Sequence, residues 1–237
     1  MELYHGTSIE KLDEILRNGI TPREERQSNW KKAPSRSDMV YLSTVYPFYF
    51  SVCAANSNKT VVFEIDLLDL DRDKLYPDED FIWQWQKREN KGKIIEHKDI
   101  RKNLEWWKFY WKESLKFMGT CCYKGIIKPE FIQRYCIFDC SKRTWLAMSI
   151  MDPSISIDNF RFLSAHYEGF VSWLFGDQKL LPHVAEAKRD SKLFADNEQI
   201  YTDYQKRILF WTKESQNRDG IEIVELKNEK VSKTKIK

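Results

Sequence analysis

Three short groups of residues carry the side chains in this sequence that could do chemistry. The segment His5-Gly6-Thr7 ends an apolar stretch, and Tyr41 lies in a second apolar stretch at 39–44. The third group is the acidic triplet Asp78-Glu79-Asp80. A glycine lets another group approach the backbone closely, and a tyrosine on a neighbouring strand offers a flat face. The first two groups therefore suit the binding of a flat polar ring, although a histidine before a glycine is also typical of a simple turn.

The elements that must position these groups alternate between strands and short helices. Hydrophobic alternation predicts strands, and apolar residues at helical spacing predict helices. Ser8 suits the N-cap of the first helix and Gly19 follows its last turn. The predicted strands cover 2–5, 40–43, 60–67, 120–123, 134–138 and 221–226, and the predicted helices about 9–18, 47–55, 99–118, 160–175 and 196–212.

This order predicts an α+β fold with two parts. Residues 1–140 form the core, with a basic and helical insertion at 82–118. Residues 141–237 form a mainly helical extension whose Lys-rich end we expect to be disordered. The helix predicted at 99–118 has one apolar stripe, which consists of Leu104, Trp107, Trp111 and Leu115.

Composition limits the function classes. The chain has 237 residues and a net charge of +3, which does not by itself indicate a nucleic-acid partner. No apolar run is long enough for a transmembrane helix and no signal-peptide pattern opens the chain, so we expect a cytoplasmic protein without a membrane partner. The five cysteines contain no CxxC and lie apart from the four histidines, so we expect neither a disulfide framework nor a metal site.

Basic residues cluster in three places, at 23–36, 87–93 and 227–237. Residues 23–38 form a long, charged loop without periodicity, which is typical of a substrate loop but also of a solvated one. Several tryptophans stand beside lysine or arginine, as at 30–32 and 83–88. Aromatic rings mixed with cations suit base stacking in a positive groove, and they also suit lysine stems that cover core aromatics.

The order of these motifs resembles the ADP-ribosyltransferase fold. The resemblance runs over about residues 1–140, through the His-Gly-Thr strand, the helix, the basic loop, the strand Val-Tyr-Leu-Ser at 40–43 and the segment Gly-Ile-Ile-Lys-Pro-Glu-Phe-Ile at 125–132. It is similar to the branch with a His–Tyr pair that poly-ADP-ribose polymerases and diphtheria-like toxins share. This resemblance implies a split β-sheet and NAD as co-substrate.

The resemblance also implies a role for each matching residue. His5 would donate a hydrogen bond to a ribose hydroxyl of NAD, and the Gly6 backbone would pair with the nicotinamide carboxamide. Tyr41 would stack on the nicotinamide ring. The hydroxyls of Thr7 and Ser43 would assist, and Tyr49 would be either a second wall of the site or part of the core.

The sequence departs from the family pattern at the carboxylate that completes the site. Many members carry a Glu on a late strand, and here Thr120 occupies that position. Three explanations stay open: Glu79 or Asp80 supplies the acid, Glu130 moves in, or the protein binds NAD without transferring ADP-ribose. An acidic triplet is also comfortable as a plain helix N-terminus.

The acceptor is a separate expectation. The basic segments at 23–38 and 82–93 favour a nucleic-acid acceptor over a protein, and Pro47-Phe48-Tyr49-Phe50 is similar to a phrase in bacterial toxins that modify DNA bases. An RNA 2′-phosphotransferase-like enzyme, a protein-modifying transferase and a non-catalytic NAD- or nucleic-acid-binding module remain as alternatives. By analogy, such a transferase would be the toxin of a toxin–antitoxin or phage-defence system, with an antitoxin protein as partner.

Overall fold

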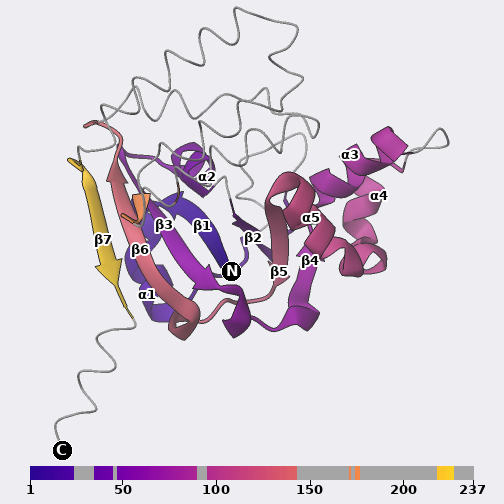
Figure 1. The fold of residues 1–237 in the computed structure, drawn as a ribbon, viewed down its shortest axis with the longest axis horizontal. Coiled ribbons are helices and arrows are strands. Elements are labelled where there is room, and N and C mark those ends of the chain that lie inside the picture. Colours follow the sequence, from indigo (N-terminus) through magenta and orange to yellow (C-terminus); the bar gives the residue numbers. More distant parts are fainter. Residues whose placement is uncertain are drawn as a thin grey trace, which may run out of the picture.

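A seven-stranded antiparallel sheet organises the part of the chain that the computed structural model describes, which comprises residues 1–23, 35–44, 47–89, 95–142, 171, 174–176 and 218–226. The strand order is β4-β5-β2-β1-β3-β6-β7 (Figure 1). The strands are β1 (Glu2–Ser8), β2 (Met39–Ser43), β3 (Lys59–Asp66), β4 (Leu75–Pro77), β5 (Thr120–Lys124), β6 (Ile132–Asp139) and β7 (Ile221–Glu225). The predicted α+β class is therefore confirmed.

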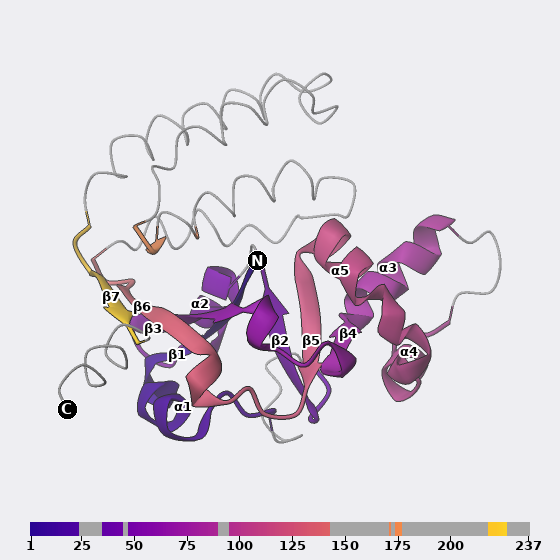
Figure 2. The ribbon, with the colours of Figure 1, turned by 60° about the horizontal axis from the view of Figure 1, so that its bottom comes forward.

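Short helices connect and cover the strands. The α-helices are α1 (Leu12–Asn18), α2 (Pro47–Ala54), α3 (Glu79–Glu89), α4 (His97–Lys102) and α5 (Trp111–Met118). The 3-10 helices are η1 (Ile9–Lys11), η3 (Leu67–Asp69), η4 (Arg72–Lys74), η5 (Leu104–Tyr110) and η6 (Pro129–Phe131). Both ribbon views place α3, α4 and α5 together beside β4 and β5, at the end of the sheet away from β7 (Figure 2).

The sheet consists of two halves that meet at one point. Strands β1 and β3 pair from Glu2 opposite Asp66 to Ser8 opposite Thr60, and β2 pairs with β5 along its whole length. Between β1 and β2, in contrast, only Tyr4 and Ser43 lie opposite each other. Beyond this pair the two strands diverge, which opens the sheet at the position of His5.

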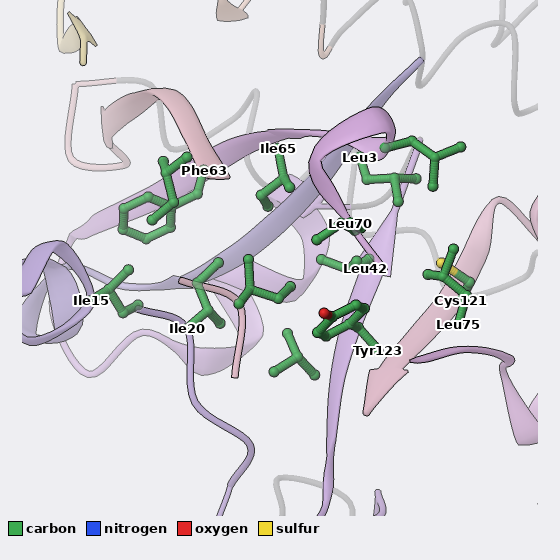
Figure 3. Packing of buried hydrophobic residues seen from close by; sticks show 14 of the residues in the cluster. Leu3, Ile15, Ile20, Leu42, Phe63, Ile65, Leu70, Leu75, Cys121 and Tyr123 are labelled. Carbon is green, nitrogen blue, oxygen red and sulfur yellow. The ribbon is translucent and has the colours of Figure 1, made fainter. Parts of the chain in front are cut away.

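One hydrophobic core joins the two halves. Leu3 of β1 and Phe63 and Ile65 of β3 belong to the same buried cluster as Leu42 of β2 and Cys121 of β5 (Figure 3). All five side chains are at most 1% exposed. Because this shared core lies on one face of both halves, the halves stay together although few ladder hydrogen bonds cross between them.

A second cluster lies on the opposite face of β2, β4 and β5. It contains Met39, Tyr76 and Cys122 from these strands and Phe81 and Ile82 from α3. Along β2, Val40 and Leu42 thus face the first core, whereas Met39 and Tyr41 face the second, as the period of two in a strand requires. This alternation directs the Tyr41 side chain toward α3 and α4.

Some sequence-based expectations about local structure were wrong. Residues 99–118 form α4, η5 and α5 instead of one helix, and Gly119 (φ 67°) ends α5 as expected. Ser8 is the N-cap residue of η1, as expected from its position, but its buried hydroxyl makes no capping hydrogen bond. The acidic triplet lies at the start of α3, which is the helix N-terminus that its composition also suited.

The expected C-terminal extension contributes β7 to the edge of the core sheet, where it pairs with β6. The helices expected at 160–175 and 196–212 lie outside the described residues, apart from 171 and 174–175, and so does the Lys-rich tail at 227–237. The middle of the basic loop, 24–34, also lies outside them.

Candidate functional site

The opening between β1 and β2 is bridged by a side chain. Nδ1 of His5 lies 3.0 Å from the carbonyl oxygen of Tyr41. A carbonyl can only accept, so Nδ1 carries the proton and donates it. The imidazole therefore takes the place of a strand partner for the Tyr41 carbonyl and connects β1 with β2 at this point.

The strand geometry also directs the peptide group of Gly6 into this opening. Along a strand, peptide groups point alternately to the two neighbours. The N–H of Thr44 donates to Gly119 on the β5 side (2.8 Å), so Ser43 points toward β1. Because Ser43 pairs with Tyr4, the N–H and C=O groups of Tyr4 point toward β2. Gly6 lies two residues further along β1, so its N–H and C=O groups point in the same direction, into the gap between the strands.

The structure gives a different reason for the glycine than the sequence suggested. A Cβ on Gly6 would lie 1.7 Å from the carbonyl oxygen of Pro47 and 2.9 Å from the Ser51 nitrogen, both in α2. The space that the missing side chain leaves is filled by α2, not open to a ligand. Glycine is needed here because a helix packs directly on the strand, while the peptide edge remains directed into the gap.

His5 is uncharged at neutral pH. Its half-buried ring is desolvated and lies near the charge of Arg23, and these effects outweigh the hydrogen bond to Tyr41 and lower its pKa to about 4. With Nδ1–H donating to the carbonyl, Nε2 of the neutral ring holds a lone pair. With this tautomer, Nε2 of His5 can accept a hydrogen bond from a hydroxyl.

The hydroxyl of Tyr41 makes two hydrogen bonds. It donates to Oε1 of Glu79 at 2.5 Å and accepts from the backbone N–H of Arg36 at 2.9 Å. Burial is the main reason why the pKa of Tyr41 is raised well above 10, so the phenol stays neutral. A hydroxyl with both roles filled fixes the orientation of the ring, which is what a stacking face needs.

The three carboxylates of the acidic triplet lie in different environments. Glu79 is 3% exposed, and burial raises the pKa of its carboxyl although Tyr41 donates to it. Asp78 is also buried, and burial with the nearby charges of Asp80 and Glu79 holds its pKa well above the usual value. Asp80 points outward, where its carboxylate contacts His97 at 2.8 Å.

A cavity of about 420 Å³ lies at the opening, with lining residues from β1, α1, β2 and the segment before β2. His5 and Thr7 of β1 and Tyr41 of β2 line it, as expected from the sequence. Further lining comes from three cations and one carboxylate, which are Lys11, Arg23, Arg36 and Glu14. The volume falls in the range of small-molecule sites, about 300–1,000 Å³, and the excess of cations favours an anionic ligand.

The other expected site residues do not line this cavity. The hydroxyl of Ser43 donates to the Gly119 carbonyl at 2.8 Å. Thr120 is buried near the Asp78 carboxyl without a hydrogen bond of normal geometry. Glu130 contacts Lys128 in η6, and the side chain of Tyr49 lies outside the described part of the structure.

The sequence did not identify four of the charged residues that line the cavity. Arg23 and Arg36 lie near the two ends of the basic loop that the sequence singled out, so the signal was present at the level of the segment. Lys11 and Glu14 pair at 2.9 Å on the exposed face from η1 to α1. A Lys-x-x-Glu spacing is common on helix surfaces, so nothing in the sequence distinguishes this pair from an ordinary surface pair.

Comparison with known proteins does not assign a family. No protein-family model matches the sequence, and no curated protein matches it. The chain is similar to a solved structure named EcPltA, with a TM-score of 0.35 and 11% identity over 60% of this chain and 78% of that one. A likeness this weak carries no conclusion about fold or activity.

The described ranges contain neither a candidate membrane span nor a candidate metal-binding cluster. No helix there combines the length and apolar character that a membrane span requires. No group of three or more histidine, cysteine, aspartate or glutamate side chains lies close enough there to hold a metal ion. The cavity at the β1–β2 opening is the candidate site because His5, Thr7 and Tyr41 line it together.

Proposed function

We propose that this protein is an NAD-dependent ADP-ribosyltransferase. The observation that carries the proposal is the hydrogen bond from His5 Nδ1 to the Tyr41 carbonyl at 3.0 Å, beside a cavity of about 420 Å³. This bond fixes a neutral imidazole beside the backbone of Tyr41, whose ring is oriented by the hydrogen bonds of its hydroxyl to Glu79 and Arg36. The resemblance in motif order leads to the same two residues.

The lining residues fit the parts of NAD. Arg23 and Lys11 suit the two negative charges of the pyrophosphate, and Arg36, whose guanidinium pairs with Asp38 at 2.7 Å, also lines the cavity. Nε2 of His5 suits a ribose hydroxyl as its acceptor, and the Tyr41 ring suits the nicotinamide. The Gly6 peptide, which points into the gap, suits the carboxamide because one peptide offers both a donor and an acceptor.

In the proposed reaction, the bond between nicotinamide and ribose C1′ breaks and nicotinamide leaves as a neutral base. An acceptor atom forms the new bond to C1′ and releases its proton. The ribose develops positive charge in the transition state, so a nearby carboxylate accelerates the step. Among the described lining residues, Glu14 is the carboxylate in position to do this, whereas Glu79 lies behind Tyr41 and positions it.

The proposed acceptor is a base in RNA or DNA. The cationic lining and the basic loop from which Arg23 and Arg36 come favour an anionic acceptor. We also propose, by analogy alone, that such an enzyme would be a toxin restrained by an antitoxin. A protein acceptor and a 2′-phosphotransferase reaction remain the competing activities.

The test is incubation of the protein with adenine-labelled NAD and total cell extract, followed by separate digestion with protease and nuclease. The proposal expects label that survives protease and is released by nuclease, and its loss with His5→Ala. Label that only protease removes would assign a protein acceptor. Asp13→Asn is the control, because it changes a carboxylate that does not line the cavity.

A non-catalytic NAD-binding module is the second candidate. It is favoured by Thr120 in place of the expected Glu and by the burial of Glu79. Such a module would gain thermal stability with NAD and release no nicotinamide. Release above a buffer blank rules this candidate out.

A further inference from the structure

The segment that was expected to be one helix presents two large aromatic side chains to solvent. Trp106 is 74% exposed and Phe109 is 86% exposed, and both lie on η5. Burying a large apolar side chain stabilises a protein by about 1.5–3 kcal/mol. Two adjacent rings left in water therefore forgo substantial stabilisation and indicate a surface that binds something.

The 3-10 geometry of η5 explains why these two rings lie together. Residues three apart are eclipsed in a 3-10 helix. Leu104, Trp107 and Tyr110 form one row, which packs into the second core cluster. Trp106 and Phe109 form another row, so both side chains lie on the same outer side of the helix.

The third row of η5 is fixed against β4 and β5. Glu105 accepts from the Tyr76 hydroxyl at 2.7 Å and pairs with Lys124 at 2.7 Å. Lys108 lies 5.5 Å from the centre of the Tyr76 ring. With two rows held by the protein, η5 is a rigid support for the Trp106–Phe109 row.

The charge around this row is positive. Residues 101–116 contain five cations, which are Arg101, Lys102, Lys108, Lys112 and Lys116, and two carboxylates, Glu105 and Glu113. The difference is +3, and Lys124 further offsets Glu105. Exposed aromatic rings among lysines match the chemistry of unpaired bases on a negative backbone.

The row is connected to the rim of the candidate site. Arg101, at the end of α4, donates to the carbonyl of Ser35 at 3.1 Å, and Arg36 donates to the carbonyl of Arg101. Ser35 and Arg36 both line the cavity. A nucleic-acid strand whose bases stack on the exposed rings of η5 could therefore continue past α4 to the cavity rim.

We propose that Trp106 and Phe109 form a stacking platform for a single-stranded nucleic acid. Unpaired bases stack on the two rings, and Lys102, Lys108 and Lys112 neutralise the adjacent phosphates. The binding is independent of NAD. The further assignment of this strand as the acceptor rests on the proposed function.

The test is a titration, without NAD, of a fluorescent single-stranded RNA of about 16 nucleotides, followed by anisotropy. Loss of one stacking ring weakens single-strand binding at least about fivefold, so Trp106→Ala with Phe109→Ala should weaken it at least about 25-fold. A duplex of the same sequence should bind more weakly than the single strand. Leu68→Ala and Ile126→Ala are matched controls, since these exposed apolar residues (73% and 54%) lie in η3 and next to β5, and they should leave binding unchanged.

A second readout isolates the charge. Replacing Lys102, Lys108 and Lys112 with alanine should reduce the slope of log Kobs against log salt concentration by about 2. No binding by the wild type, equal binding by the Trp106/Phe109 double variant, or equal binding of duplex and single strand would overturn the proposal. Loss of a co-purifying protein from that double variant, with RNA binding unchanged, would assign the surface to a protein instead.

The platform and the enzymatic activity can fail separately. Nicotinamide release from NAD in the absence of RNA is expected to be the same in the double variant and the wild type. If release is observed but RNA binding is not, the platform alone is wrong. If RNA binds through the two rings and no nicotinamide is released, the transferase proposal alone is wrong.

Discussion

The hydroxyl of Tyr41 donates a 2.5 Å hydrogen bond to Glu79, a carboxylate that is only 3% exposed. Arg101 contributes an ion pair to the same oxygen at 3.8 Å. A buried carboxylate needs such partners because desolvation penalises its charge. The link joins the acidic triplet to the cavity wall, with Glu79 behind the ring that the ligand would contact.

Tyr41→Phe should therefore destabilise the protein by about 1–3 kcal/mol, because the buried Glu79 carboxylate loses its hydrogen-bond donor and keeps only the ion pair with Arg101 at 3.8 Å, and the N–H of Arg36 loses its acceptor. Tyr76→Phe removes a comparable bond, but its partner Glu105 is exposed, so we expect a loss of at most about 1 kcal/mol. Urea denaturation measures both. Equal losses in the two variants would show that Glu79 does not depend on Tyr41.

Gly6→Ala should destabilise the protein by about 3 kcal/mol or more. The new methyl group would lie 1.7 Å from the Pro47 carbonyl oxygen, and backbone cannot move aside cheaply. Gly125→Ala is the control: it has φ +92° but no atom within 4 Å of the added Cβ, so only backbone strain of about 1–2 kcal/mol is expected. A mild effect at Gly6, measured by thermal unfolding, would contradict the close packing of α2 on β1.

The sequence predicted α2 and every strand of the described residues except the three-residue β4, because alternating or continuous apolar runs bounded by turn residues specify them locally. It also led to His5, Thr7 and Tyr41, which line one cavity. It did not predict the break in helix 99–118, where Glu105 of η5 contacts Tyr76 and Lys124, residues distant in the sequence that periodicity does not reveal. The position of Glu14 in the cavity lining was equally hidden, because only the tertiary fold brings α1 to the β1–β2 opening.

His5 should make the protein less stable in mild acid. Its pKa is about 4 in the folded state and about 6.5 when unfolded, so the unfolded chain binds more protons between these values. The contribution is fully present above pH 6.5 and is lost as the pH falls toward 4. Denaturant unfolding at several pH values should show a smaller acid-dependent loss in His5→Asn than in the wild type.

His97 supplies the opposite control for this measurement. Its hydrogen bond to Asp80 raises the pKa above the ordinary value, so it adds stability that is present below pH 6.5 and disappears as the pH rises through the raised value. His97→Asn should therefore steepen the acid-dependent loss. A His5→Asn curve parallel to the wild-type curve would contradict the buried, neutral imidazole.

Glu14→Gln should lower the rate of nicotinamide release by about a hundredfold, because it removes the carboxylate that lines the cavity. Asp13→Asn is the matched control, since this neighbouring carboxylate does not line the cavity. Steady-state kinetics should show the change mainly in kcat. If Glu14→Gln retains the wild-type rate and Glu79→Gln loses it, the catalytic carboxylate is Glu79.

The most direct test of the site is nicotinamide release from NAD by the purified protein, compared between the wild type, His5→Ala and His97→Ala. The site predicts release above a buffer blank for the wild type and for His97→Ala, and at least a tenfold loss for His5→Ala with the fold retained. No release by the wild type, or an undiminished rate in His5→Ala, would contradict a catalytic site at the β1–β2 opening.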